Sequence, residues 1–227
     1  MVGGKQLLRY LQVSLLLLLL MLWGSLDSAF AGKIKGTVKV KGLRSPANIL
    51  VYLTKAPTFS SDLSGAKVVM DQNRLTFTPH VLPILVGTTV HFPNNDKVDH
   101  NVFSLSRAKK FSLGSYKPGE IKTVLFDKPG IVELRCDVHA EMAAYILVMK
   151  NPYWARTDEK GRFEIPDSDD LKNLGISGIE ALPPGKYFLK TWHEKLKSKR
   201  TTVIVEKEGE ADLQLDLTRG TPSVLYK

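Results

Sequence analysis

The segment from residue 130 to residue 149 reads GIVELRCDVHAEMAAYILVM, and apolar residues dominate both of its ends. β-Branched and aromatic residues in these runs predict two short strands, Val132 to Cys136 and Tyr145 to Met149. The loop between them begins with the only cysteine of the 227-residue chain and continues to His139 and Met142. A thiol, an imidazole and a thioether are therefore expected on one tight turn.

A second imidazole, that of His100, follows a strand-like segment upstream and completes a set of four donors. Cysteine thiolate, two neutral imidazoles and a weak methionine sulfur are the ligands of blue-copper electron-transfer sites. We therefore predict one copper site held by four residues: His100, Cys136, His139 and Met142. Glu141 is the alternative axial ligand, although the softness of sulfur favours Met142. Taken singly, such residues are more often structural, so the prediction depends on their grouping.

The remaining histidines carry weaker signals. We expect His80, which follows Pro79, to be a hydrogen-bonded structural imidazole, with a place beneath the metal loop as the alternative. His91 is expected to face solvent from an alternating strand. His193 is expected at the surface end of a strand, and a second metal site or partner contact is its alternative role.

Residues 1–31 have the pattern of a signal peptide. Lys5 and Arg9 precede an apolar run from Leu11 to Trp23, and Ala29-Phe30-Ala31 predicts cleavage before Gly32. The run is shorter than the roughly 18 residues of a spanning helix, so no stable membrane span is expected after cleavage. We predict a periplasmic or otherwise extracytoplasmic protein. A single cysteine cannot form an internal disulfide, so in an oxidising compartment we expect it to be buried or bound to metal.

The chain is basic, with 32 Lys and Arg against 23 Asp and Glu and a net charge of +9. Such a surface attracts anionic partners. For an exported copper protein, the expected partner is a redox protein, such as a dehydrogenase or cytochrome with an acidic docking surface. Nucleic acid is not expected as a partner outside the cytoplasm.

The rest of the sequence predicts an all-β protein. Short segments rich in β-branched and aromatic residues are separated by Gly and Pro turn signals, which is typical of sandwiches and barrels. Only Asp167 to Ala181 is expected to be irregular, with one helical turn. The predicted strands include Lys33 to Val40, Ile49 to Leu53, Thr88 to Phe92, Val132 to Cys136, Tyr145 to Met149, Tyr187 to Trp192, Thr201 to Val205 and Asp212 to Leu217.

The middle of the chain resembles plastocyanin-type cupredoxins, and its Cys-x-x-His-x-x-Met spacing is similar to that of the amicyanin type. The resemblance lies in Phe77-Thr78-Pro79, Val86 to Phe92, Asn94-Asn95-Asp96, His100 to Phe103 and Gly130 to Cys136. It implies a Greek-key sandwich of seven or eight strands, with His100 before one strand and the other ligands on the loop joining the last two. Asn101 is expected either to brace Asp137 or to be an ordinary turn residue. Asp99, Asp137 and Arg135 depart from the usual pattern, which bears on the colour and potential of the site.

The flanking segments resemble a carboxypeptidase regulatory-like domain with a transthyretin-like β-sandwich. The resemblance lies in Gly36-Thr37-Val38, Ala47 to Leu53, Thr157 to Ile165 and Leu182 to Tyr187. It implies a cupredoxin domain at 70–151 inserted in, or joined to, a second sandwich made of 32–56 and 153–227. Each is then expected to fold as its own unit. The alternative is one enlarged cupredoxin with decorated ends.

No catalytic constellation is evident. The sequence has no nucleophile elbow, no phosphate-cradling glycine loop and no zinc-protease helix motif. A copper site closed by four protein ligands also leaves no position for substrate. The expected function is therefore electron transfer by an exported type 1 copper protein, not enzymatic catalysis. The alternatives are copper storage or delivery without redox cycling, and a metal-free structural or carbohydrate-binding double sandwich.

Overall fold

The computed structural model describes residues 32–57, 59, 67–176, 179, 181–206 and 210–221. The predicted signal peptide and its cleavage site lie outside this part of the chain. The described residues are nearly all β, in several sheets, which confirms the predicted fold class. Among them, no helix has the length and apolar character needed to cross a membrane.

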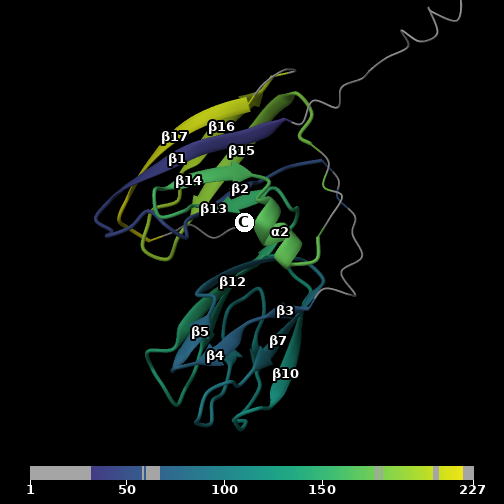
Figure 1. The fold of residues 1–227 in the computed structure, drawn as a ribbon, viewed down its shortest axis with the longest axis vertical. Helices are drawn as coiled ribbons and strands as arrows, with labels where there is room; N and C mark the ends of the chain where they lie inside the picture. The colour runs from purple at the N-terminus through teal and green to yellow at the C-terminus, as the bar shows by residue number, and fades with distance from the viewer. Residues whose placement is uncertain are drawn as a thin grey trace, which may run out of the picture. The chain divides into compact units, whose positions relative to one another are not determined.

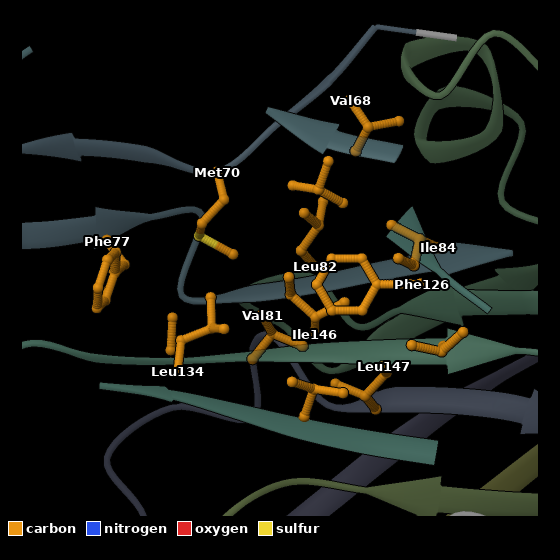
Figure 2. Close-up of a cluster of buried hydrophobic side chains, with 14 of the residues drawn as sticks. Val68, Met70, Phe77, Val81, Leu82, Ile84, Phe126, Leu134, Ile146 and Leu147 are labelled. Carbon is orange, nitrogen blue, oxygen red and sulfur yellow. The ribbon is translucent and has the colours of Figure 1, made fainter. Parts of the chain in front are cut away.

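The central sandwich, as we call the elements β3 to β12, carries the predicted copper ligands. One sheet has the order β10-β7-β3, a second has the order β6-β12-β11-β8-β9, and β4 and β5 form a hairpin. Figure 2 shows apolar side chains of this sandwich gathered into a core, Met70, Phe126 and Ile146 among them. The strands are β3 (Val68–Val69), β4 (Asp71–Asn73), β5 (Thr76–Thr78), β6 (Val81–Leu85), β7 (Thr88–Pro93), β8 (Phe103–Ser104), β9 (Phe111–Ser112), β10 (Ile121–Phe126), β11 (Gly130–Arg135) and β12 (Ala143–Met149).

The terminal sandwich, as we call the remaining strands, comes from both ends of the described chain. Its sheets have the orders β14-β1-β17 and β13-β2-β15-β16. The first two strands are β1 (Lys33–Lys41) and β2 (Leu50–Leu53). The others follow the central sandwich: β13 (Trp154–Arg156), β14 (Arg162–Ile165), β15 (Gly185–Trp192), β16 (Arg200–Val205) and β17 (Glu210–Thr218).

Strands far apart in sequence pair throughout the terminal sandwich. β1 runs parallel to β17 from Lys33 opposite Glu210 to Lys41 opposite Thr218, and the two lie side by side in Figure 1. β2 pairs with β13 on one side and β15 on the other. This pairing is the one that an inserted central domain requires. The resemblance to a carboxypeptidase regulatory-like domain is not shown, and the predicted domain bounds stay a prediction.

Strand β2 and the last residues of β15 are buried on both faces of their sheet. Val51 and Leu189 lie in the core of the terminal sandwich. Leu50, Tyr52 and Trp192, which point the other way in alternating strands, are buried in the same cluster as the central core. The two sandwiches therefore share apolar packing, and folding of either one alone would uncover it.

The structure also contains a turn and a short helix where the sequence predicts them. Gly161 closes the turn before β14 with a φ of +78°, and a Cβ there would lie 2.2 Å from the Val38 carbonyl oxygen. Glycine is therefore required at this position. The irregular segment after β14 contains one short helix, α2 (Ser168–Asn173), as expected from Asp167 to Ala181. The Asp167 carboxylate caps it by accepting the Asp169 and Asp170 amides.

Candidate metal centre

The loop between β11 and β12 is a tight return, as the sequence predicts. Arg135 and Ala143 form the last residue pair of β11 and β12. The seven residues from Cys136 to Met142 must therefore reverse the chain direction between these two positions. The Met142 amide donates to the His139 carbonyl oxygen at 3.0 Å, and the Cys136 amide donates to the Met142 carbonyl oxygen at 3.4 Å. These bonds fold His139 back toward the cysteine.

His100 reaches the same place from the loop between β7 and β8. A two-way backbone bridge with Tyr116 holds it, with N to O distances of 3.2 and 2.9 Å. The side chain is fully buried. A surface turn residue would not be fixed in this way, so this imidazole has a defined position.

The structure brings three of the four predicted ligands together. The ligand atoms of His100, Cys136 and His139 all lie within 4.8 Å of one another. Cys136 Sγ is 3.9 Å from His100 Nδ1 and 4.0 Å from His139 Nδ1, and the two Nδ1 atoms are 3.1 Å apart. Cys136 and His100 are buried, and His139 is half-buried at the edge of the site.

Met142 is buried in the same cluster as Cys136, whereas the neighbouring Glu141 is exposed. Burial of the thioether and exposure of the carboxylate are consistent with Met142 as the axial ligand. The axial position stays a prediction.

Asp96 is a site residue that the sequence analysis did not identify. Its Oδ2 lies 3.0 Å from His100 Nε2, on the opposite side of the ring from Cys136. Hydrogen bonds from the Leu75 amide, the His100 ring and the Lys97 amide lower the pKa of Asp96 to about 2. The carboxylate therefore stays ionised and fixes the ring. The only signal in the sequence that could have indicated this role of Asp96 is its position four residues before His100, directly after two asparagines.

The contact with Asp96 decides which His100 nitrogen can bind metal. An ionised carboxylate only accepts, so Nε2 carries the hydrogen and Nδ1 presents its lone pair to Cys136 and His139. The Nδ1 atom of His139 lies 3.1 Å from that lone pair. Two imidazole nitrogens and a sulfur facing one another in this way require a proton or a cation among them. Soft sulfur with two imidazoles fits copper.

The predicted brace between the two ligand loops is present. Asn101 Nδ2 donates to Asp137 Oδ2 at 3.0 Å, and the Asp137 amide donates to Asn101 Oδ1 at 3.0 Å. Each partner lies next to a candidate ligand in the sequence. The pair therefore couples the position of His100 to that of Cys136, as outer hydrogen bonds do in metal sites.

The other three histidines lie outside this group, and His91 on β7 is half-buried and not fully exposed to solvent as expected. His80 is half-exposed, and its Nδ1 is 3.2 Å from the Ala143 carbonyl oxygen, next to the metal loop. His193 is 12% exposed, so it is more buried than a strand-end surface residue. Both contact Glu194, which the sequence analysis did not single out.

We predict that Asp96→Ala weakens copper binding by about 10- to 100-fold, because the ring of His100 loses its orienting acceptor. Asp96→Asn keeps an acceptor oxygen and is expected to restore most of the affinity. Competition with a chelator of known affinity measures both. Asp99→Ala is the matched control, since it removes an exposed carboxylate beside His100. Equal losses in the Asp96 and Asp99 variants would show that only local charge matters.

Comparison with solved structures finds cupredoxins at low identity and partial coverage. A purple cupredoxin from Nitrosopumilus maritimus is 23% identical over 37% of this chain and 100% of that chain, with a TM-score of 0.34. The copper-containing nitrite reductase NirK from Thermus scotoductus is 22% identical over 50% of this chain and 28% of that chain, with a TM-score of 0.37. A reduced amicyanin variant is 19% identical over 44% of this chain and 98% of that chain, with a TM-score of 0.34.

No protein-family model matches the chain, and neither does any curated protein. TM-scores of this size carry no argument about function. The assignment of the site therefore rests on its own donors and their geometry.

Proposed function

We propose that this protein is an exported electron carrier with one type 1 copper site, held by His100, Cys136 and His139 with Met142 as the axial ligand. The observation that carries the proposal is the convergence of a thiol and two imidazoles from two loops within 4.8 Å. Copper bound there would supply a one-electron couple. The residues of the chain would position the donors, exclude water and provide a route for electrons to the protein surface.

The scaffold supports electron transfer because it constrains the donors from several sides. Two-way hydrogen bonds tie His100 to Tyr116 and Asn101 to Asp137, and the β11–β12 ladder holds the ends of the metal loop. A site that keeps one geometry in both oxidation states needs little rearrangement when an electron moves. Cys136 is 4% exposed, so bulk water has little access to the thiolate.

Half-buried His139 is the proposed route by which electrons reach a partner. Two exposed apolar side chains lie on the ligand loops: Val138, next to His139 in sequence, at 58% exposure, and Val98, two residues before His100, at 43%. Exposed carboxylates flank the ligands in sequence: Asp99, Asp137 and Glu141. We propose that a dehydrogenase or cytochrome docks here. These carboxylates favour basic groups on the part of the partner that contacts the ligand loops. The net charge of the whole chain, in contrast, favours an acidic partner.

The experiment is a redox cycle followed by visible absorption. The full chain, loaded with one equivalent of Cu²⁺, is reduced with ascorbate and then reoxidised. We expect strong absorption in the red that disappears on reduction and returns on oxidation over repeated cycles. A protein that binds only Cu⁺ and stays colourless would instead support storage or delivery. Absence of stoichiometric copper would support a metal-free structural role.

The axial assignment gives a further prediction. Met142→Leu is expected to keep the strong colour and to raise the reduction potential, because loss of a weak donor favours Cu⁺. Glu141→Gln, at the neighbouring exposed position, is the control and is expected to shift the potential less. Potentiometric titration of both variants measures the difference. A larger shift in Glu141→Gln would assign the axial position to the carboxylate.

A further inference from the structure

The hairpin of β15 and β16 carries more than half of the net charge of the chain. Residues 185–205 contain six lysines and arginines and one acidic residue, a net charge of +5 against +9 for all 227 residues. We call these residues the basic hairpin. The acid, Glu194, does not offset the bases at the surface, because its side chain is only 14% exposed and contacts His80. The bases are Lys186, Lys190, Lys195, Lys197, Lys199 and Arg200.

The register of the two strands places three of these bases on one face of the sheet. Leu189 and Val203 lie in the core of the terminal sandwich, so the residues that alternate with them point away from that core. This outward face contains three bases and no acid within the two strands. Its residue pairs across the strands are Lys186 with Ile204, Phe188 with Thr202, and Lys190 with Arg200.

Two exposed apolar side chains lie among the bases of this face. Ile204 is 59% exposed and Phe188 is 39% exposed. The Lys186 ammonium lies 5.8 Å from the centre of the Phe188 ring, which is a cation–π contact. β16 is the edge strand of its sheet, next to β15 (Figure 1). Cationic and apolar side chains are therefore mixed on a surface at the edge of the sheet.

Protection of the sheet edge does not account for this composition. Charged side chains on an edge strand block its pairing with other sheets. β16 is that strand, but its only base is Arg200, and the other five bases lie on β15 and in the connecting loop. Lys186, Lys197 and Arg200 also form no ion pair with another described residue, although Lys195 lies 3.8 Å from Glu194. Charge pairing within the protein therefore does not explain these three bases.

We propose that the basic hairpin binds the surface of a membrane that contains anionic phospholipids. Its bases contact lipid phosphates, and Phe188 and Ile204 enter the interfacial region. Binding of this kind combines attraction between opposite charges with burial of apolar area. Five of the six bases are lysines, which are depleted in protein–protein interfaces, so the composition favours a lipid surface over an acidic protein.

The distribution of charge along the chain favours one orientation on such a surface. Exposed carboxylates flank the proposed copper ligands, namely those of Asp99, Asp137 and Glu141. An anionic surface repels these loops and attracts the basic hairpin. The inference itself does not depend on the proposed electron-transfer function, because none of the copper ligands belongs to the hairpin.

The test is co-sedimentation with phospholipid vesicles, using the copper-free chain from Gly32 onward. This part of the chain contains every described strand and belongs to one compact unit, and it lacks the apolar run of the predicted signal peptide. We expect it to bind vesicles made of equal amounts of phosphatidylglycerol and phosphatidylcholine, and not vesicles of phosphatidylcholine alone. Added salt is expected to release the protein, because salt screens the attraction.

The variant that tests the bases combines Lys186→Gln, Lys197→Gln and Arg200→Gln, at three exposed positions of the hairpin. Each base near an anionic surface contributes about fivefold to binding, so the triple variant is expected to bind the mixed vesicles about 100-fold more weakly. The matched control removes the same charge from three exposed lysines of the central sandwich and is expected to weaken binding by less than about fivefold. These lysines are Lys110, Lys117 and Lys128.

The apolar part of the proposal has its own variant. Phe188→Ser combined with Ile204→Ser leaves the charge unchanged and is expected to weaken binding to the mixed vesicles by about 10-fold, because less apolar area is buried. Circular dichroism checks that each variant keeps the native β signal. The lipid and salt dependence of the unmodified protein tests the proposal without any variant.

Absence of binding to the mixed vesicles by the unmodified protein would overturn the proposal. Equal losses in the two triple variants would overturn it as well, because net charge alone would then cause the binding. Unchanged binding by the Phe188 and Ile204 variant would also contradict it and would favour an acidic protein as the occupant. Failure of the copper proposal would leave these results unchanged, because copper is absent from every sample.

Discussion

Cys136→Ser is expected to remove the red absorption of the copper-loaded protein completely. Copper ionises a coordinating thiol, whereas an alcohol stays protonated under the same conditions and supplies no thiolate charge transfer. The absorption spectrum after addition of one equivalent of Cu²⁺ measures the effect. Val138→Ala, an exposed position in the same loop, is the control and is expected to keep the colour. A serine variant that retains the band would exclude Cys136 from the site.

Trp154→Ala is expected to destabilise the protein by about 3–5 kcal/mol, the range found for loss of a large buried aromatic side chain. Trp154 belongs to the terminal sandwich by its strand, yet it is fully buried in the cluster of the central sandwich. Urea unfolding of the copper-free protein, followed by circular dichroism, gives the change in the free energy of unfolding. Phe188→Ala, at a position 39% exposed, is the control and is expected to cost less than about 1 kcal/mol.

The same experiment tests whether the two sandwiches unfold together. The shared core predicts one transition in the wild type, and the Trp154 variant should shift that whole transition. Two separate transitions, with only one of them moved by Trp154→Ala, would mean that the sandwiches are independent. That result would favour the expectation from the sequence that residues 70–151 fold as their own unit.

The strands with strong patterns were predictable from the sequence. Runs such as Lys33 to Val40 and Tyr145 to Met149 have enough β-branched and apolar residues for their type to be clear, and the structure confirms them as β1 and β12. The shortest strands were not predicted. β3 and β8 have two residues each, which is too few for an alternation of apolar and polar residues to be recognised.

The candidate site was likewise only partly predictable from the sequence. The donors were identifiable because copper requires particular atoms, and these occur close together around the single cysteine. The role of Asp96 was not identifiable, since an aspartate in a polar turn is ordinary and only the fold directs it at His100. Glu194 is a comparable case: in sequence it is one of many charged residues, and its burial follows from packing between segments more than 100 residues apart.

X-ray absorption at the copper K edge, on the full chain loaded with one equivalent of Cu²⁺, tests the central claim most directly. The convergence of His100, Cys136 and His139 predicts one short copper–sulfur contact and two imidazole nitrogens around the metal. Nearest neighbours that are only nitrogen and oxygen would contradict the account, because copper would then be bound without the cysteine on which the site is built.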